Sequence, residues 1–85
     1  MTSALKPKPV KISDIYIPQA LRKPVDAAKV EEIATSIADI GQQVPIQVRE
    51  DKDRYVLVTG LHRLEACKAL GEETIAGYLV QARKH

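Results

Sequence analysis

The sequence is poor in aromatic residues, cysteine and histidine, and each scarcity excludes a kind of site. Its 85 residues include three Tyr but neither Phe nor Trp, which argues against nucleic-acid binding by stacking bases on aromatic rings. The single cysteine, Cys67, excludes an internal disulfide and a multi-cysteine metal site, and it fits a reducing compartment. The two histidines, His62 and His85, are too few to suggest zinc, so we predict no metal site built by the protein alone.

Long hydrophobic runs are also missing. No stretch is long enough to span a membrane, and Met1–Pro9 lacks the apolar core of a secretory signal. We therefore expect a cytoplasmic protein with no membrane partner. The 13 Lys and Arg residues nearly balance 11 Asp and Glu residues, and a net charge of +2 is too small to imply attraction of the whole domain to nucleic acid.

The chain is long enough for one small domain, which we place between two tails. Residues 1–9 are predicted to be a flexible N-terminal leader, because two Lys-Pro pairs offer neither periodicity nor apolar surface. Residues 10–82 form the predicted domain, and residues 83–85 form a basic C-terminal tail. Basic ends are usually solvated, and contact with DNA phosphates is the alternative.

Apolar periodicity predicts the order β-α-β-β-α-β, an α/β (α+β) fold with a mixed sheet and two main flanking helices. The predicted strands are Val10–Ile17, Val44–Arg49, Tyr55–Val58 and Thr74–Gln81, and the predicted helices are Asp26–Gly41 and Leu61–Gly71. The first strand is expected to have a slip near Ser13-Asp14. Asp26 is a good helix cap and Gly41 a good helix stop. Tyr55–Val58 is apolar at every position, which is typical of a strand covered on both faces.

The most informative stretch is Val58–Arg63, where a predicted strand runs through a glycine into a predicted helix. Gly60 allows close backbone approach, and the start of a helix offers free N–H donors. His62 and Arg63 add side-chain donors, so a phosphate or another anion is the natural ligand. The alternative is an ordinary strand-to-helix turn that binds nothing, since short motifs of this kind are only hypotheses.

Three side chains are candidates for phosphate contact, and each has a structural alternative. Arg63 could hold phosphate oxygens in a bidentate way, or it could pair with Glu65. His62 could donate to phosphate or carry a proton in catalysis, or it could be a hydrogen-bonding group at a helix end. Lys29 could reach the same phosphates from the first helix, or it could be a solvated lysine beside Glu32.

The remaining candidates carry weaker signals. Thr59 and Ser36 offer hydroxyl groups to a phosphate or to metal-bound water, although such hydroxyls also commonly cap backbone groups. Cys67 shares a spacing of three residues with Leu64 and Leu70, which predicts a buried structural thiol and not a nucleophile.

Four segments resemble the ParB/sulfiredoxin superfamily in order and spacing. They are Arg22-Lys23-Pro24, Asp26–Gly41, Val44–Val48 and Tyr55–Arg63. The resemblance covers residues 12–81 and implies a domain whose Gly60-Leu61-His62-Arg63 turn holds nucleotide phosphates. The implied cofactor is a nucleotide triphosphate, ATP or CTP, with Mg²⁺ as its candidate companion.

The two branches of the superfamily match different details. ParB-type domains are similar in the Gly-x-x-Arg turn, which implies CTP and a DNA-associated or regulatory role. Their turn usually has an acidic residue and an arginine where this chain has Leu61 and His62. Sulfiredoxin is similar in Gly-x-His-Arg and in Asp26-x-x-Lys29, which implies ATP phosphate contact at Lys29, Ser36, His62 and Arg63. It has a catalytic cysteine where this chain has Leu61, so complete sulfinic acid reductase activity would need an outside thiol.

Three functions therefore stay open. The first is a nucleotide-binding domain that acts through DNA or a protein partner. The second is an ATPase or phosphotransferase in the same pocket, with His62 as proton carrier, which would be recognised by product formation. The third is a small DNA-binding module, whose affinity would fall steeply with salt and survive loss of Arg63.

Overall fold

The computed structural model describes residues 6–22, 24–42 and 44–80. Along the chain it contains strands β1 (Lys8–Lys11) and β2 (Ile15–Tyr16), helix α1 (Ala27–Ile40), strands β3 (Ile46–Asp51) and β4 (Arg54–Thr59), helix α2 (Leu61–Ala69) and strand β5 (Thr74–Leu79). Short 3-10 turns follow β1, at Ile12–Asp14, and β2, at Gln19–Leu21. The predicted α+β fold with two main helices is confirmed.

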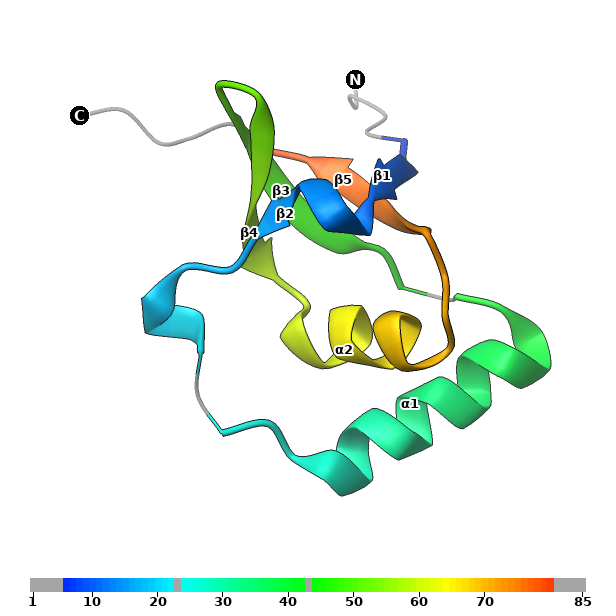
Figure 1. The fold of residues 1–85 in the computed structure, drawn as a ribbon. Helices are drawn as coiled ribbons and strands as arrows, with labels where there is room; N and C mark the ends of the chain where they lie inside the picture. Colours follow the sequence, from blue (N-terminus) through cyan, green and yellow to red (C-terminus); the bar gives the residue numbers. More distant parts are fainter. Residues whose placement is uncertain (1–5, 23, 43, 81–85) are drawn as a thin grey trace, which may run out of the picture.

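The sheet has five strands in the order β1-β5-β3-β4-β2 and is mixed. β1 pairs antiparallel with β5, β5 pairs parallel with β3, β3 pairs antiparallel with β4, and β4 pairs parallel with β2. β3 and β4 form a hairpin that turns at Lys52, whose positive φ of 57° suits a tight turn. β4 ends at Thr59 and α2 begins at Leu61, so Gly60 alone connects the strand to the helix (Figure 1).

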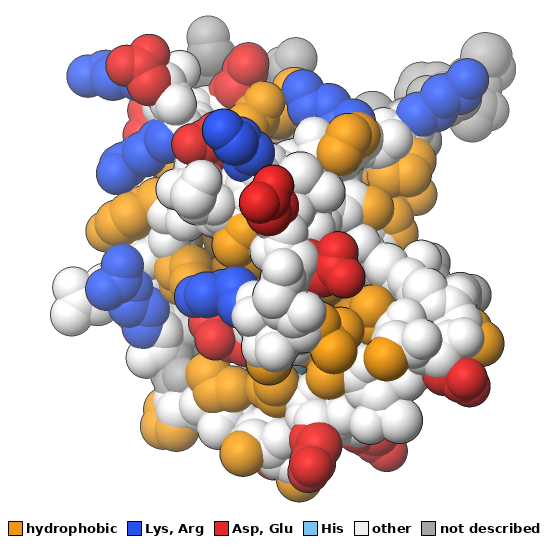
Figure 2. All heavy atoms as spheres, turned by 45° about the vertical axis from the view of Figure 1, so that its right-hand side comes forward, with side chains coloured by type: hydrophobic (Ala, Val, Ile, Leu, Met, Phe, Trp, Pro, Cys, Tyr) orange, Lys and Arg blue, Asp and Glu red, His pale blue; other side chains and the backbone are white. Residues whose placement is uncertain are grey.

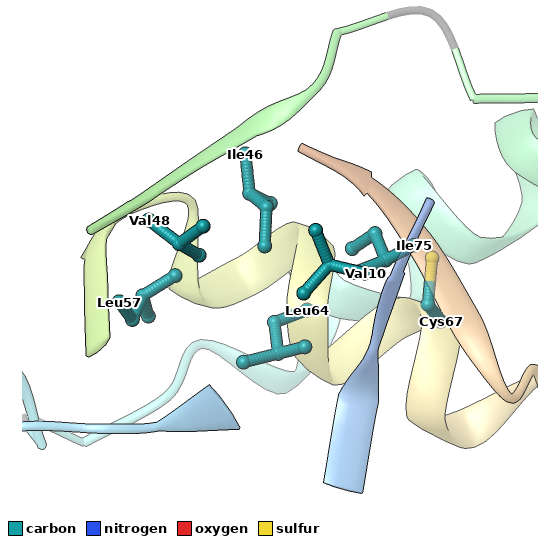
Figure 3. Close-up of a cluster of buried hydrophobic side chains, with 7 residues drawn as sticks. All are labelled: Val10, Ile46, Val48, Leu57, Leu64, Cys67 and Ile75. Carbon is teal, nitrogen blue, oxygen red and sulfur yellow. The ribbon is translucent and has the colours of Figure 1, made fainter. Parts of the chain in front are cut away.

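Helix α2 lies between the sheet and α1, so the molecule has three layers (Figure 1). The core fills the space between the sheet and α2, where seven buried side chains point toward one another (Figure 3). They are Val10, Ile46, Val48, Leu57, Leu64, Cys67 and Ile75. Helix α1 packs on the outer side of α2 and contains no fully buried residue. Helix α1 is therefore held against α2 by side chains that are only partly buried.

Helix α1 begins and ends where its local sequence signals predict. The Asp26 carboxylate accepts hydrogen bonds from the backbone N–H groups of Ala28 and Lys29, at 3.0 and 3.3 Å. Gly41, with φ +83°, ends the helix in a conformation that other residues rarely adopt. Beyond it, the Gln42 amide donates to the Ala76 carbonyl at 3.0 Å and accepts from the Ala76 N–H at 2.8 Å. Gln42 thus ties the end of α1 to β5.

The prediction of one strand over Val10–Ile17 was wrong. The segment forms β1 and β2, which lie at opposite edges of the sheet and are separated by the turn Ile12–Asp14. β1 also begins at Lys8, two residues before the predicted domain boundary. The slip expected near Ser13-Asp14 coincides with this turn, but the alternation of apolar residues could not show that the two pieces pair with different strands, β1 with β5 and β2 with β4.

Other strand boundaries shifted by small amounts. β3 begins at Ile46 instead of Val44, which is 48% exposed. β4 is covered on both faces only at its centre, where Val56 and Leu57 are buried, because Val58 is 39% exposed. β5 ends at Leu79 instead of Gln81, and α2 ends at Ala69 instead of Gly71. Gln81 itself, the basic tail, residues 1–5 of the leader and Lys23 of the basic link lie outside the described residues.

Charge is unevenly distributed over the surface. On the face in Figure 2, Lys and Arg side chains gather over the upper part, which contains the sheet, with several Asp and Glu among them, whereas the lower edge shows Asp and Glu beside hydrophobic side chains. None of the helices in the described part of the chain is long and apolar enough to cross a membrane.

Candidate functional site

A cleft of about 570 Å³ opens where β4 meets α2, with α1 forming its opposite wall. Its lining comes from four elements and their connections: Leu21, Lys29, Glu32, Ile33, Val58, Thr59, Gly60, Leu61, His62 and Arg63. The volume lies within the range of small-molecule sites. The cleft thus brings Lys29 of α1 to the same place as the Gly60–Arg63 turn, although 30 residues separate Lys29 from Thr59 along the chain.

Gly60 makes the turn possible for two reasons. Its φ of +112° lies in the region that side chains other than glycine rarely adopt. A Cβ at this position would lie 2.6 Å from Ile46 Cγ2 and 2.9 Å from Ile46 Cβ, well inside normal contact distance. Because Ile46 is fully buried in β3, the turn is pressed against the core. This close packing fixes the start of α2 relative to the sheet.

The two helix N-termini at the cleft differ in how their N–H groups are satisfied. The Asp26 carboxylate caps α1, as described above, whereas Gly60 offers α2 no side chain as a cap. The first N–H groups of a helix have no partner within the helix and carry partial positive charge. The start of α2 is therefore the better place for an anion, and it lies in the cleft.

The charged side chains of the cleft are two cations and one carboxylate. Lys29 and Arg63 line it together with Glu32. In the described part of the chain, no hydrogen bond or ion pair engages the side chain of either cation. Glu65, the alternative partner of Arg63, instead pairs with Lys68 at 3.4 Å. Both cations are thus available to an anionic ligand.

His62 has a specific partner outside its own helix. Its Nε2 accepts a hydrogen bond from the backbone N–H of Asp26, with a donor-acceptor distance of 3.3 Å. The bond joins the cap of α1 to the first turn of α2. Nothing within either segment signals this contact, because the two residues are 36 positions apart.

Two of the other candidate residues line the cleft, and a third does not. Thr59 and Leu61 line the cleft with Gly60, and Leu61 also packs against the core. Ser36 does not line it, because it lies further along α1 and borders an adjoining pocket of about 230 Å³. That pocket shares Glu32, Ile33 and Arg63 with the cleft, so Arg63 borders both spaces.

Four lining residues were not predicted as site residues. Leu21, Ile33 and Val58 give the cleft an apolar wall, and Glu32 gives it a carboxylate. Glu32 could have been found from its spacing of three residues from Lys29, which places both on one helix face. The apolar residues carry no such signal, because they look like ordinary core positions.

The described residues include no group of three or more His, Cys, Asp or Glu that could hold a metal ion. Cys67 is buried in the core on α2 and does not line the cleft. Burial raises the pKa of its thiol, and the nearby Glu72 carboxylate raises that pKa further. These properties fit the predicted structural thiol.

Comparison with known proteins finds one matching family and two similar proteins. The model of the ParB N-terminal domain matches residues 3–85. A probable chromosome-partitioning protein ParB of Campylobacter jejuni is 36% identical over 58 residues, which are 68% of this chain and 21% of that protein. The sulfiredoxin of Arabidopsis thaliana is 48% identical over 50 residues, 59% of this chain and 40% of that protein. The chain therefore spans well under half the length of these relatives.

Solved structures show the same two branches. The crystal structure of Arabidopsis thaliana sulfiredoxin has a TM-score of 0.82 and 34% identity, over 89% of this chain and 85% of that one. Caulobacter crescentus ParB complexed with CTP-γ-S has a TM-score of 0.78 and 23% identity, over 92% and 46%. A free serine kinase in complex with AMP has a TM-score of 0.77 and 16% identity, over 93% and 32%. These structures share the fold of this chain, and the family match over residues 3–85 shows that the chain belongs to the ParB N-terminal domain family, within the ParB/sulfiredoxin superfamily.

Proposed function

We propose that this chain is a nucleotide-binding domain that holds the phosphates of its ligand at the Gly60–Arg63 turn, with Lys29 as a contact from the opposite wall. One observation carries the proposal: the uncapped N-terminus of α2 and two cations without described partners line one cleft. N–H donors, Arg and Lys in one concave site suit a polyphosphate, which can engage all three.

The fold family supports the same ligand class. A neighbour with this fold is complexed with a CTP analogue, and another is in complex with AMP. The apolar wall formed by Leu21, Ile33 and Val58 gives the uncharged part of a nucleotide a surface to contact. The family match also motivates a DNA-associated or regulatory role for the longer proteins in which such domains occur.

Magnesium would enter this site mainly with the ligand. Among the described residues, Glu32 supplies the one carboxylate that lines the cleft. Mg²⁺ prefers six oxygen ligands and keeps several waters, so phosphate oxygens and water would provide the rest of its shell.

The structure favours binding over covalent catalysis. Leu61, the first residue of α2, is a hydrocarbon side chain packed against the core, so it supplies no nucleophile. Cys67 is buried away from the cleft with a raised thiol pKa. A bound phosphate would therefore be held and positioned by these residues without being attacked by them.

An NMR titration of the ¹⁵N-labelled protein tests the proposal. ATP, CTP and GTP are each added with and without Mg²⁺, and amide shifts are followed along the chain. We expect one or more nucleotides to shift the amides of residues 59–63 and the first turn of α1. The proposal fails if all three leave these amides unmoved at millimolar concentration. The same sample is then titrated with DNA at several salt concentrations, which tests the alternative that the domain is a small DNA-binding module.

A further inference from the structure

The hydrogen bond between Asp26 and His62 determines the state of the histidine ring. A ring nitrogen can accept a hydrogen bond only when it carries no proton. Because Nε2 accepts from the Asp26 N–H, the neutral ring must carry its proton on Nδ1. Nε2 is therefore already used within the protein, and it is not free to donate a proton to a ligand.

The location of this bond gives it a mechanical role. It joins the cap residue of α1 to the second residue of α2, where both helices face the cleft. Helix α1 buries no residue fully and packs on α2, and this bond adds a specific polar link between the starts of the two helices. Lys29 lies only three residues after Asp26, and its backbone N–H is held by the Asp26 carboxylate. Any shift of Asp26 is thus transmitted to Lys29.

We propose that His62 is a positioning residue whose neutral ring ties the start of α1 to α2 and so sets Lys29 across the cleft from Arg63. The inference rests on the proposed function, because Lys29 and Arg63 are there assigned to the same phosphates. His62 then acts as a structural acceptor, and the role of catalytic proton carrier does not fall to its Nε2.

The proposal makes the bond sensitive to protonation. An imidazolium has N–H groups at both nitrogens, so it cannot accept from the Asp26 N–H. The Asp26 carboxylate belongs to the same cap residue, and Lys29, Glu32 and Arg63 line the same cleft. Protonation of the ring would remove the acceptor and break this hydrogen bond.

The first test uses the free protein and needs no nucleotide. NMR of the ¹⁵N-labelled imidazole should show the Nδ1–H tautomer for His62 at pH 8. The His62→Asn variant should shift the Asp26 amide resonance and speed the exchange of that amide with solvent, whereas His62→Gln should change both less. An Nε2–H tautomer, or an Asp26 amide that responds equally to both replacements, overturns the proposal.

The second test separates positioning from direct phosphate contact. Gln places its side-chain oxygen about as far from the backbone as Nε2, whereas Asn places it about as far as Nδ1. We expect His62→Asn to lower nucleotide affinity about two- to tenfold, the worth of one hydrogen bond, and His62→Gln to lose clearly less than His62→Asn. The reverse order would mean that Nδ1 contacts the ligand and that the link is unimportant.

A double-mutant cycle with Lys29→Ala completes the design. If His62 acts by positioning Lys29, the loss caused by His62→Asn should shrink once Lys29 is absent. Additive losses would contradict the proposal, because they would mean that the two residues act separately. If neither ATP nor CTP binds the wild type, the proposed function fails, and the tautomer and the response of the Asp26 amide still decide whether the link exists.

Discussion

Replacing Gly60 with alanine should destabilise the protein by an amount that can be estimated from two separate costs. The first is the positive φ of +112°, because a left-handed conformation costs a residue with a Cβ about 1–2 kcal/mol. The second is overlap with Ile46, whose Cγ2 and Cβ would lie 2.6 and 2.9 Å from the new Cβ. Overpacking in a filled core typically costs about 1–3 kcal/mol. Together the costs are about 2–5 kcal/mol, a large part of the about 5–15 kcal/mol typical of small proteins.

Gly71→Ala is the matched control, since it separates the two costs. Gly71 also has a positive φ, +79°, but a Cβ there would have no atom within 4 Å. Its replacement should therefore cost only the backbone term, about 1–2 kcal/mol. Urea denaturation followed by far-UV circular dichroism measures both free energies of unfolding. A Gly60→Ala variant no less stable than Gly71→Ala would refute the close packing of the turn against Ile46.

Three further predictions concern the residues that hold the helices and the sheet in place. Asp26→Ala removes the cap of α1 and should lower the free energy of unfolding by about 0.5–2 kcal/mol, with Asp26→Asn losing less, as measured in urea. Gln42→Ala removes the bonds to Ala76, so the Ala76 amide should exchange with solvent faster than in the wild type, while unchanged exchange would contradict its role. Because the pKa of Cys67 is raised in the fold, the unfolded thiol ionises first, and stability should fall as the pH rises above about 8.5. Urea titrations at neutral and alkaline pH should show a smaller fall for Cys67→Ala, and an equal fall would contradict the burial argument.

Local signals were sufficient for the helices. The carboxylate of Asp26 and the flexible backbone of Gly41 act within a few residues of α1, so the sequence contains the reasons for its boundaries. The turn at Gly60 was also predictable, because a strand, a glycine and a helix follow one another along the chain. These features need no knowledge of distant segments.

Long-range pairing was not visible in the sequence. Val10 pairs with Ile75 at one edge of the sheet, whereas Ile15 pairs with Tyr55 at the other, and a run of alternating apolar residues is compatible with either. The contact between Asp26 and His62 is hidden for the same reason. Ser36 was assigned to the site for its hydroxyl group and from the resemblance, and its place further along α1 puts it beside the adjoining pocket.

The claim that the cleft binds nucleotide phosphates is tested most directly by comparing two arginine variants. Arg63→Ala and Arg54→Ala remove the same charge, but Arg54 lies on the β3–β4 hairpin, where it pairs with Asp51 outside the cleft. Calorimetric titration with the nucleotide that gives the largest amide shifts should show affinity reduced about 10- to 100-fold by Arg63→Ala, the worth of hydrogen bonds to a charged group. Arg54→Ala should stay within about twofold of the wild type. Equal affinities for Arg63→Ala and the wild type, or equal losses in both variants, would contradict the proposed site.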